Sequence, residues 1–178
     1  VEGLEKLQRP GLLILANHPT LLDVVFLGSL VPNATCGVKS ALRNNPAMRG
    51  FVSMTGYITN DDGKELISAS EAALQKGSSL LIFPEGTRSR SGQLKPFKKG
   101  AFKMAQDLQL PVLPVTLTGT FEILPPGTAR LRPGQHAQIT LHPAISPLGH
   151  SEAELVRLMH QSHTAIAAPL GEACPQPG

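Results

Sequence analysis

The chain has 178 residues, 41% of them hydrophobic, which is enough to bury one substantial core and too few for two well-formed domains. No apolar run approaches the ~20 residues of a membrane-spanning helix, and the lack of Trp, with a single Tyr, argues against a surface that stacks nucleic-acid bases. The six histidines show no metal-ligand spacing. Neither a metal nor a nucleic-acid partner is therefore expected. One domain is predicted over residues 1–168, and the Pro-rich residues 169–178 are predicted to be disordered.

Short apolar runs alternate with segments of helical periodicity along the chain. Strands are predicted over residues 11–16, 34–38, 57–59, 78–83, 111–117 and 136–142. Helices are predicted over residues 19–30, 41–54, 64–76, 99–108 and 151–167, the last opened by a capping box from Ser151 to Glu154. This alternation predicts an α/β fold with a central mixed, largely parallel sheet and helices on its faces. Ligands bind at the carboxyl ends of the strands in such folds, so the segments that follow the strands are candidate sites.

A histidine and an aspartate follow the first predicted strand, as His18 and Asp23. Pro19 suits the first position of a helix, which places His18 at or beside the N-cap. Residues five apart within one helix point about 140° away from each other, but a histidine outside the helix can fold back over the first turn. Asp23 would then accept from Nδ1 and leave Nε2 free to take a proton, as a general base does. The competing interpretation is a capping histidine with an aspartate that suits the helix dipole.

The polar turn Pro84-Glu85-Gly86-Thr87-Arg88-Ser89 follows the fourth predicted strand. With the histidine block it resembles the glycerophospholipid acyltransferases of the PlsC type, which acylate lysophosphatidate and related lysolipids. Residues 39–61 resemble the second block of that family and residues 110–115 the fourth, so the resemblance covers about residues 11–120. Many members end the second block with Asp-Arg, whereas this chain has Asn60-Asp61-Asp62 and lacks that arginine. This departure leaves the acceptor head group open.

The resemblance implies transfer of a fatty acyl group to the hydroxyl of a lysophospholipid, with 1-acylglycerol-3-phosphate as the expected acceptor and phosphatidate as the product. The acyl donor would be the thioester of acyl-CoA or of acyl carrier protein, with no cofactor. His18 is expected to act as general base with Asp23 as its support, without a covalent intermediate. The acceptor and its phosphate are expected to bind to Lys39, Glu85, Gly86, Thr87 and Arg88. Arg88 offers a planar fork for phosphate, whereas Glu85 would accept either from an acceptor hydroxyl or from backbone N–H groups that shape the turn.

Basic residues gather after the second motif, with no acidic residue between Gly86 and Gln106. They are Arg88, Arg90, Lys95, Lys98, Lys99 and Lys103. Such a field favours phosphate groups, an acidic carrier protein or an anionic membrane surface, although a solvated face accounts equally well for any one lysine. Cys36 and Cys174 are expected to be reduced thiols. The expected location is the cytoplasmic face of a membrane, peripheral or anchored by a segment outside this chain.

Three other functions compete with this one. The acceptor could be a different hydroxylated lipid, which the altered second block leaves open. A thioesterase could use the same base to activate water, but water needs no phosphate clamp such as Arg88. A catalytically silent lipid-binding or acyl-carrier-binding protein needs neither His18 nor Asp23.

Overall fold

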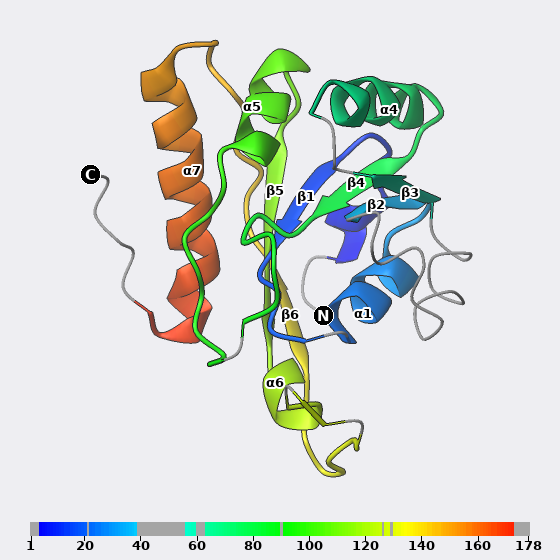
Figure 1. Ribbon diagram of the computed structural model, residues 1–178, viewed down its shortest axis with the longest axis vertical. Helices are drawn as coiled ribbons and strands as arrows, with labels where there is room; N and C mark the ends of the chain where they lie inside the picture. Colours follow the sequence, from blue (N-terminus) through cyan, green and yellow to red (C-terminus); the bar gives the residue numbers. More distant parts are fainter. Residues whose placement is uncertain are drawn as a thin grey trace.

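A six-stranded sheet forms the centre of the molecule, with strand order β3-β2-β4-β1-β5-β6 (Figure 1). The computed structural model describes residues 4–20, 22–38, 56–59, 63–89, 91–125, 127–128 and 130–172. The strands are β1 (Leu13–Ala16), β2 (Ala34–Val38), β3 (Gly56–Thr59), β4 (Ser79–Ile82), β5 (Val112–Thr118) and β6 (Gln138–Leu141). All neighbouring strands are parallel except β6, which is antiparallel to β5. The predicted mixed, largely parallel sheet is therefore confirmed.

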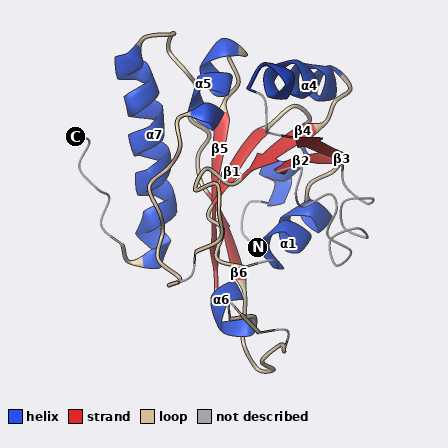
Figure 2. Ribbon diagram, in the orientation of Figure 1, coloured by secondary structure: helices blue, strands red, loops and turns tan. Residues whose placement is uncertain are grey.

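Helices cover both faces of the sheet (Figure 2). The helices are α1 (Leu22–Leu30), α4 (Gly63–Gln75), α5 (Gly100–Asp107), α6 (Thr120–Ile123) and α7 (Glu152–Ala167), with 3₁₀ helices η1 (Leu4–Gln8) and η3 (Ala168–Leu170). The short elements η1 and α6 were not predicted, because five or fewer residues show no clear helical period. No helix among these described elements is long and apolar enough to cross a bilayer.

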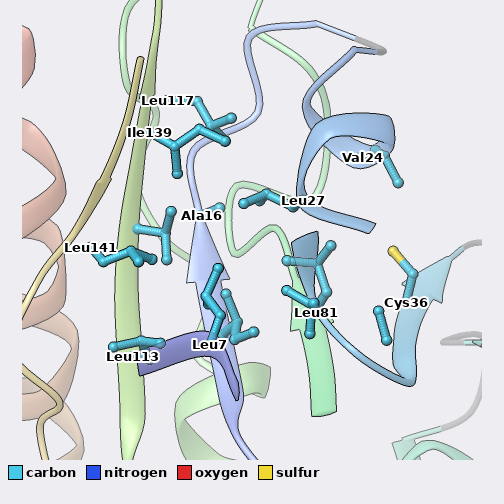
Figure 3. Close-up of a cluster of buried hydrophobic side chains, with 14 residues drawn as sticks. Leu7, Ala16, Val24, Leu27, Cys36, Leu81, Leu113, Leu117, Ile139 and Leu141 are labelled. Atoms are coloured by element: carbon cyan, nitrogen blue, oxygen red, sulfur yellow. The ribbon is translucent and has the colours of Figure 1, made fainter. Parts of the chain in front are cut away.

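The central strand β1 divides two hydrophobic cores. Side chains alternate along a strand, so Ile14 and Ala16 pack with η1 and α1, whereas Leu13 and Leu15 pack with α5 and α7. Figure 3 shows the first of these cores, in which Leu7 of η1 and Leu27 of α1 lie against the sheet. All four residues of β1 are fully buried, which explains why its sequence is apolar without interruption.

Helix α1 begins at Leu22, so the prediction that Pro19 opens this helix is wrong. The side chains of Thr20 and Asp23 decide the start. The Leu22 N–H donates to Thr20 Oγ1 at 3.1 Å, and the Thr20 N–H donates to Asp23 Oδ2 at 2.6 Å. The bond from the Thr20 N–H to Asp23 is half of a capping box with aspartate in place of the usual glutamate, while the Thr20 hydroxyl accepts from Leu22 instead of Asp23.

The C-terminal helix α7 begins as predicted, with Ser151 Oγ accepting from the Glu154 N–H at 3.2 Å. After it, Glu172 accepts from the Leu94 N–H at 2.9 Å. The segment predicted to be disordered, 169–178, therefore starts within η3 and includes Glu172, which makes a defined contact. Its remaining residues, 173–178, lie outside the described residues. The helix predicted over 41–54 and the end of the second family block, 60–62, also lie outside them.

Candidate active site

The two sequence motifs meet at the carboxyl edge of the sheet. β1 and β4 are parallel neighbours, with Leu15 opposite Ile82, so the segments that follow them leave the sheet side by side. His18 lies in the first of these segments and the 84–89 turn forms the second. Both therefore stand where ligands bind in parallel α/β sheets.

The His18 ring is held between a carboxylate and an aromatic ring. Nδ1 lies 3.1 Å from Oδ2 of Asp23, so the contact expected from the sequence is present. The Phe83 ring stacks on the imidazole, with 4.2 Å between centroids and 25° between planes. The side chain of His18 is 15% exposed, whereas that of Asp23 is fully buried. Nε2 has no hydrogen bond to any residue that the structure describes, so the ring presents one nitrogen outward and keeps the other for Asp23.

Asp23 is itself fixed by Thr20. Its Oδ2 accepts from the Thr20 N–H at 2.6 Å and its Oδ1 from the Thr20 hydroxyl at 3.2 Å. A buried carboxylate needs such partners, because an unpaired one would be costly to remove from water. The same carboxylate thus caps α1 and orients His18. The two interpretations of this segment, cap or catalytic orienter, do not exclude each other.

The 84–89 turn makes hydrogen bonds to both the N–H and the carbonyl of His18. Glu85 Oε1 accepts from the His18 N–H at 2.7 Å, and the Ser89 N–H donates to the His18 carbonyl at 2.9 Å. Glu85 Oε2 accepts from the Lys95 N–H at 3.0 Å. Burial raises the pKa of Glu85, while these two N–H donors act in the opposite direction. Of the two roles weighed for Glu85, the structure shows the bond to backbone N–H groups.

Asn17 ties the end of β1 to β5. Its Nδ2 donates to the Leu117 carbonyl at 2.9 Å, and its Oδ1 accepts from the Leu117 N–H at 2.7 Å. The side-chain amide thereby continues the strand ladder in place of a peptide group. Asn17 was not among the predicted site residues, since an asparagine at the end of a strand is common in ordinary turns.

Two lysines from the next segment reach the turn at residues 86–88. Gly86 has φ +73°, which favours glycine. A Cβ built there would lie 2.8 Å from Cε and Nζ of Lys98, so the end of this lysine lies over the backbone of the turn. Lys95 Nζ donates to the Arg88 carbonyl at 2.7 Å and to Thr87 Oγ1 at 3.2 Å. The side chains of Thr87 and Arg88 are exposed. The turn therefore presents several cationic groups to solvent.

The remaining lysines of this basic segment have acidic partners. Lys99 pairs with Glu152, and Lys103 Nζ lies 2.9 Å from Asp107. Lys98 makes no ion pair with the part of the chain that the structure describes. Sequence composition identified this basic segment but could not separate Lys98 from its neighbours. Two other predicted anion-binding or basic residues, Lys39 and Arg90, lie outside the described residues.

The described residues contain no group of three or more His, Cys, Asp or Glu side chains that could hold a metal ion. The described site is built from one histidine with its buried carboxylate, a stacked aromatic ring and a cationic turn. This arrangement can take a proton from a group bound beside Nε2 and can attract an anionic portion of the same molecule.

Comparison with known proteins matches the chain to one family. The family model described as Acyltransferase matches residues 1–118. A chloroplastic 1-acyl-sn-glycerol-3-phosphate acyltransferase of Brassica napus is 32% identical over 88% of the chain and 46% of its own length. The 1-acyl-sn-glycerol-3-phosphate acyltransferase of Saccharomyces cerevisiae is 33% identical over 71% of the chain and 45% of its own length. The chain thus spans about half the length of the curated relatives it matches.

The fold agrees with that of a solved relative. The crystal structure of the 1-acyl-sn-glycerophosphate acyltransferase PlsC of Thermotoga maritima superposes with a TM-score of 0.77 and 27% identity, over 98% of this chain and 73% of the other. Sequence family and three-dimensional structure point the same way, and the chain therefore belongs to the acyltransferase family of the PlsC type.

Proposed function

We propose that this domain transfers a fatty acyl group from a thioester to the hydroxyl of a lysophospholipid, with 1-acylglycerol-3-phosphate as acceptor and phosphatidate as product. The observation that carries the proposal is the His18 imidazole, held by buried Asp23 on Nδ1 and open at Nε2, beside a cationic turn. The names of the matched relatives support this choice of reaction.

In this reaction His18 Nε2 accepts the proton of the acceptor hydroxyl while the hydroxyl oxygen attacks the thioester carbonyl. The new C–O bond forms, the C–S bond breaks, and the imidazolium returns its proton to the leaving thiolate. Asp23 stabilises the imidazolium through Nδ1. General-base assistance of this kind contributes about 10²–10⁴ in rate.

The states of Ser89, in the turn beside His18, and of Cys36, on β2, support direct transfer without a covalent intermediate. The buried Ser89 hydroxyl donates its proton to the Gln93 carbonyl at 2.7 Å and not to the His18 ring. Burial raises the pKa of the Cys36 thiol to about 12, so it carries almost no thiolate at neutral pH. Direct attack by the acceptor hydroxyl, with His18 as its base, therefore fits the site better than an acyl-enzyme on Ser89 or Cys36.

The phosphate of the acceptor would bind at Arg88 and Lys98, with Thr87 as a polar neighbour and Lys39 as a further cation. Arg88 presents a fork of donors and Lys98 a point charge. Acyl-CoA and acyl carrier protein both satisfy the donor chemistry. We place the reaction at the cytoplasmic face of a membrane with an anionic surface, because a lysophospholipid acceptor resides in the lipid phase.

The test is thiol release from acyl-CoA and from acyl carrier protein thioester, each with and without lysophosphatidate. Release that depends on the acceptor, and falls by about 10²–10⁴ in His18→Ala, is the expected result. His150→Ala removes an exposed histidine from the opposite edge of the sheet and serves as the matched control. Release without acceptor would replace the proposal by a thioesterase, and folded protein with no release from either donor would contradict it.

A further inference from the structure

A loop projects from the same edge of the sheet as His18. β5 runs parallel to β1 and is tied to it by Asn17, so α6 and residues 124–137 leave from the carboxyl edge. Residues 124–137 are called here the projecting loop. Figure 1 shows α6 and the described residues of this loop extending beyond the rest of the molecule. We propose that the projecting loop docks the domain on an anionic membrane surface.

The composition and exposure of the loop fit such a surface. Residues 124–137 contain no acidic residue. Every described residue from 127 to 138 is exposed, and Leu131, 58% exposed, lies between Arg130 and Arg132. An exposed leucine flanked by cations can enter the interfacial region of a bilayer while the guanidinium groups bind lipid phosphates. An acidic protein partner would also match the charge of the loop, but such a partner would not explain why the exposed Leu131 lies between the two arginines.

The two arginines also share one open hollow. Thr128, Leu131 and Pro133 line it together with Arg130 and Arg132, and its volume is about 380 Å³. Both arginines border this hollow, so a lipid phosphate bound there would lie beside two cationic residues and an exposed leucine. Charge and shape thus favour a phospholipid head group at the tip of the loop.

The loop is fixed at its base. The Arg132 N–H donates to the Ile123 carbonyl at 2.9 Å, and the Thr128 hydroxyl donates to the Pro125 carbonyl at 2.8 Å. Such preorganisation lowers the entropy lost on binding. Phe121 of α6 packs towards Gly92, where a built Cβ would lie 3.5 Å from its ring, and Gly92 follows the 84–89 turn closely. A membrane bound to the loop would therefore face the edge of the sheet that carries His18.

The experiment measures sedimentation with vesicles of phosphatidylcholine alone and of an equal mixture of phosphatidylcholine and phosphatidylglycerol. Wild type should bind the mixed vesicles, and the double variant Arg130→Gln/Arg132→Gln should bind on the order of 20-fold more weakly, since each basic residue near an anionic surface contributes about fivefold. Leu131→Gln should weaken binding by up to roughly tenfold.

Matched controls lie at the opposite edge of the sheet. Arg9 and Lys76 precede parallel strands, Leu148 follows the antiparallel strand β6, and all three are exposed. Arg9→Gln/Lys76→Gln and Leu148→Gln should leave vesicle binding within about twofold. Equal losses in loop variants and controls, or no binding by wild type, would overturn the proposal. Loop variants that bind vesicles normally but lose acyl carrier protein would make the loop a protein-docking surface instead.

This inference rests on the proposed function only in that its acceptor resides in a membrane. Vesicle binding is measured without substrates, so it succeeds or fails independently of thiol release. With detergent-dispersed lysophosphatidate the loop variants should release thiol at the wild-type rate, because none of the changed residues lies in the His18 site. A lack of thiol release in all proteins, together with loop-dependent vesicle binding, would reject the reaction and retain the docking surface.

Discussion

His18 is held by contacts on three different parts of the residue. Asp23 bonds to Nδ1, Phe83 stacks on the ring, and Glu85 and Ser89 bond to the backbone N–H and carbonyl. Both hydrogen bonds of Glu85 go to backbone N–H groups, those of His18 and Lys95, so we infer that it positions His18 in the proposed reaction. In the proposed reaction these contacts would hold the His18 base in place, and a misplacement by 1 Å can lower a catalytic rate by about 10²-fold.

Replacing Glu85 by Gln tests this positioning. A Gln side chain has one acceptor oxygen, so either the His18 or the Lys95 N–H loses its partner, at a cost of about 1–3 kcal/mol in the free energy of unfolding. We expect kcat for thiol release to fall by about tenfold or more, while KM for the acceptor changes little. Glu71→Gln, on the exposed face of α4, is the control. A higher KM with unchanged kcat and unchanged urea midpoint would instead assign Glu85 to acceptor binding.

Lys98 and Lys99 are adjacent and differ only in their surroundings. Lys98 lies over Gly86 in the cationic turn, whereas Lys99 pairs with Glu152 on the surface. Lys98→Met should raise KM for lysophosphatidate by about tenfold, since a hydrogen bond to a charged group is worth about 1.5–3 kcal/mol. Lys99→Met should leave KM unchanged. Steady-state kinetics with varied acceptor compare the two, and equal effects would show that only the overall charge matters.

At the scale of elements, α6 sets the direction of the projecting loop. Gly119 caps this helix with φ +79°, and a Cβ built there would lie 1.9 Å from the His136 carbonyl oxygen. The backbones at residues 119 and 136 can therefore approach this closely at the base of the loop only because residue 119 is glycine. Phe121 then packs towards Gly92, which connects the loop to the segment behind the active-site turn.

Two glycines with the same φ allow the cost of a left-handed backbone to be separated from the cost of a steric clash. Gly119 and Gly134 both have φ +79°, but a Cβ at Gly134 meets no atom within 4 Å. Gly134→Ala should cost about 1–2 kcal/mol in the free energy of unfolding, the price of a left-handed alanine. Gly119→Ala must also move the His136 backbone and should cost more, on the order of 3 kcal/mol or above. Urea unfolding measures both, and equal losses would show that the loop base relaxes freely.

At the scale of the whole molecule, the order of the sheet brings distant segments together. The strand order places β1 between β4 and β5, so residues near 18, 85 and 117 meet at one edge. The second core, on the other face of β1 from α1, is closed by α7, whose His163 is buried against Phe97 with 4.8 Å between ring centroids. Within the described part of the chain, neither ring nitrogen of His163 has a hydrogen-bond partner.

This histidine should make global stability depend on pH. Burial lowers the pKa of His163, which Glu172 opposes and His160 reinforces. The folded state thus binds fewer protons than the unfolded state, so stability is lost as pH falls below the unfolded pKa of about 6.5. His163→Leu should remove this part of the loss between about pH 7 and pH 5. Urea midpoints of wild type and variant over this range measure it, and parallel curves would contradict the assignment.

The sequence by itself was sufficient wherever the cause was local. The apolar run of β1 predicted a strand, the capping residues of α7 predicted its start, and the short spacing of His18 and Asp23 predicted their contact. The start of α1 was misplaced because Pro19 and Thr20 are both acceptable at a helix terminus, and the Thr20–Asp23 bonds decide between them.

Only the tertiary structure decided the contacts between distant segments. Glu85 bonds to the backbone of His18, and Asn17 to that of Leu117. Every residue but proline offers a backbone N–H, so such a partner leaves no mark in the sequence. The separate surroundings of Lys98 and Lys99, and the exposure of Leu131 at the active-site edge, likewise arise only when the strands have taken their order. Local spacing therefore predicted the pair His18 and Asp23, whereas the packing of the sheet determined what holds that pair in place and which surface lies beside it.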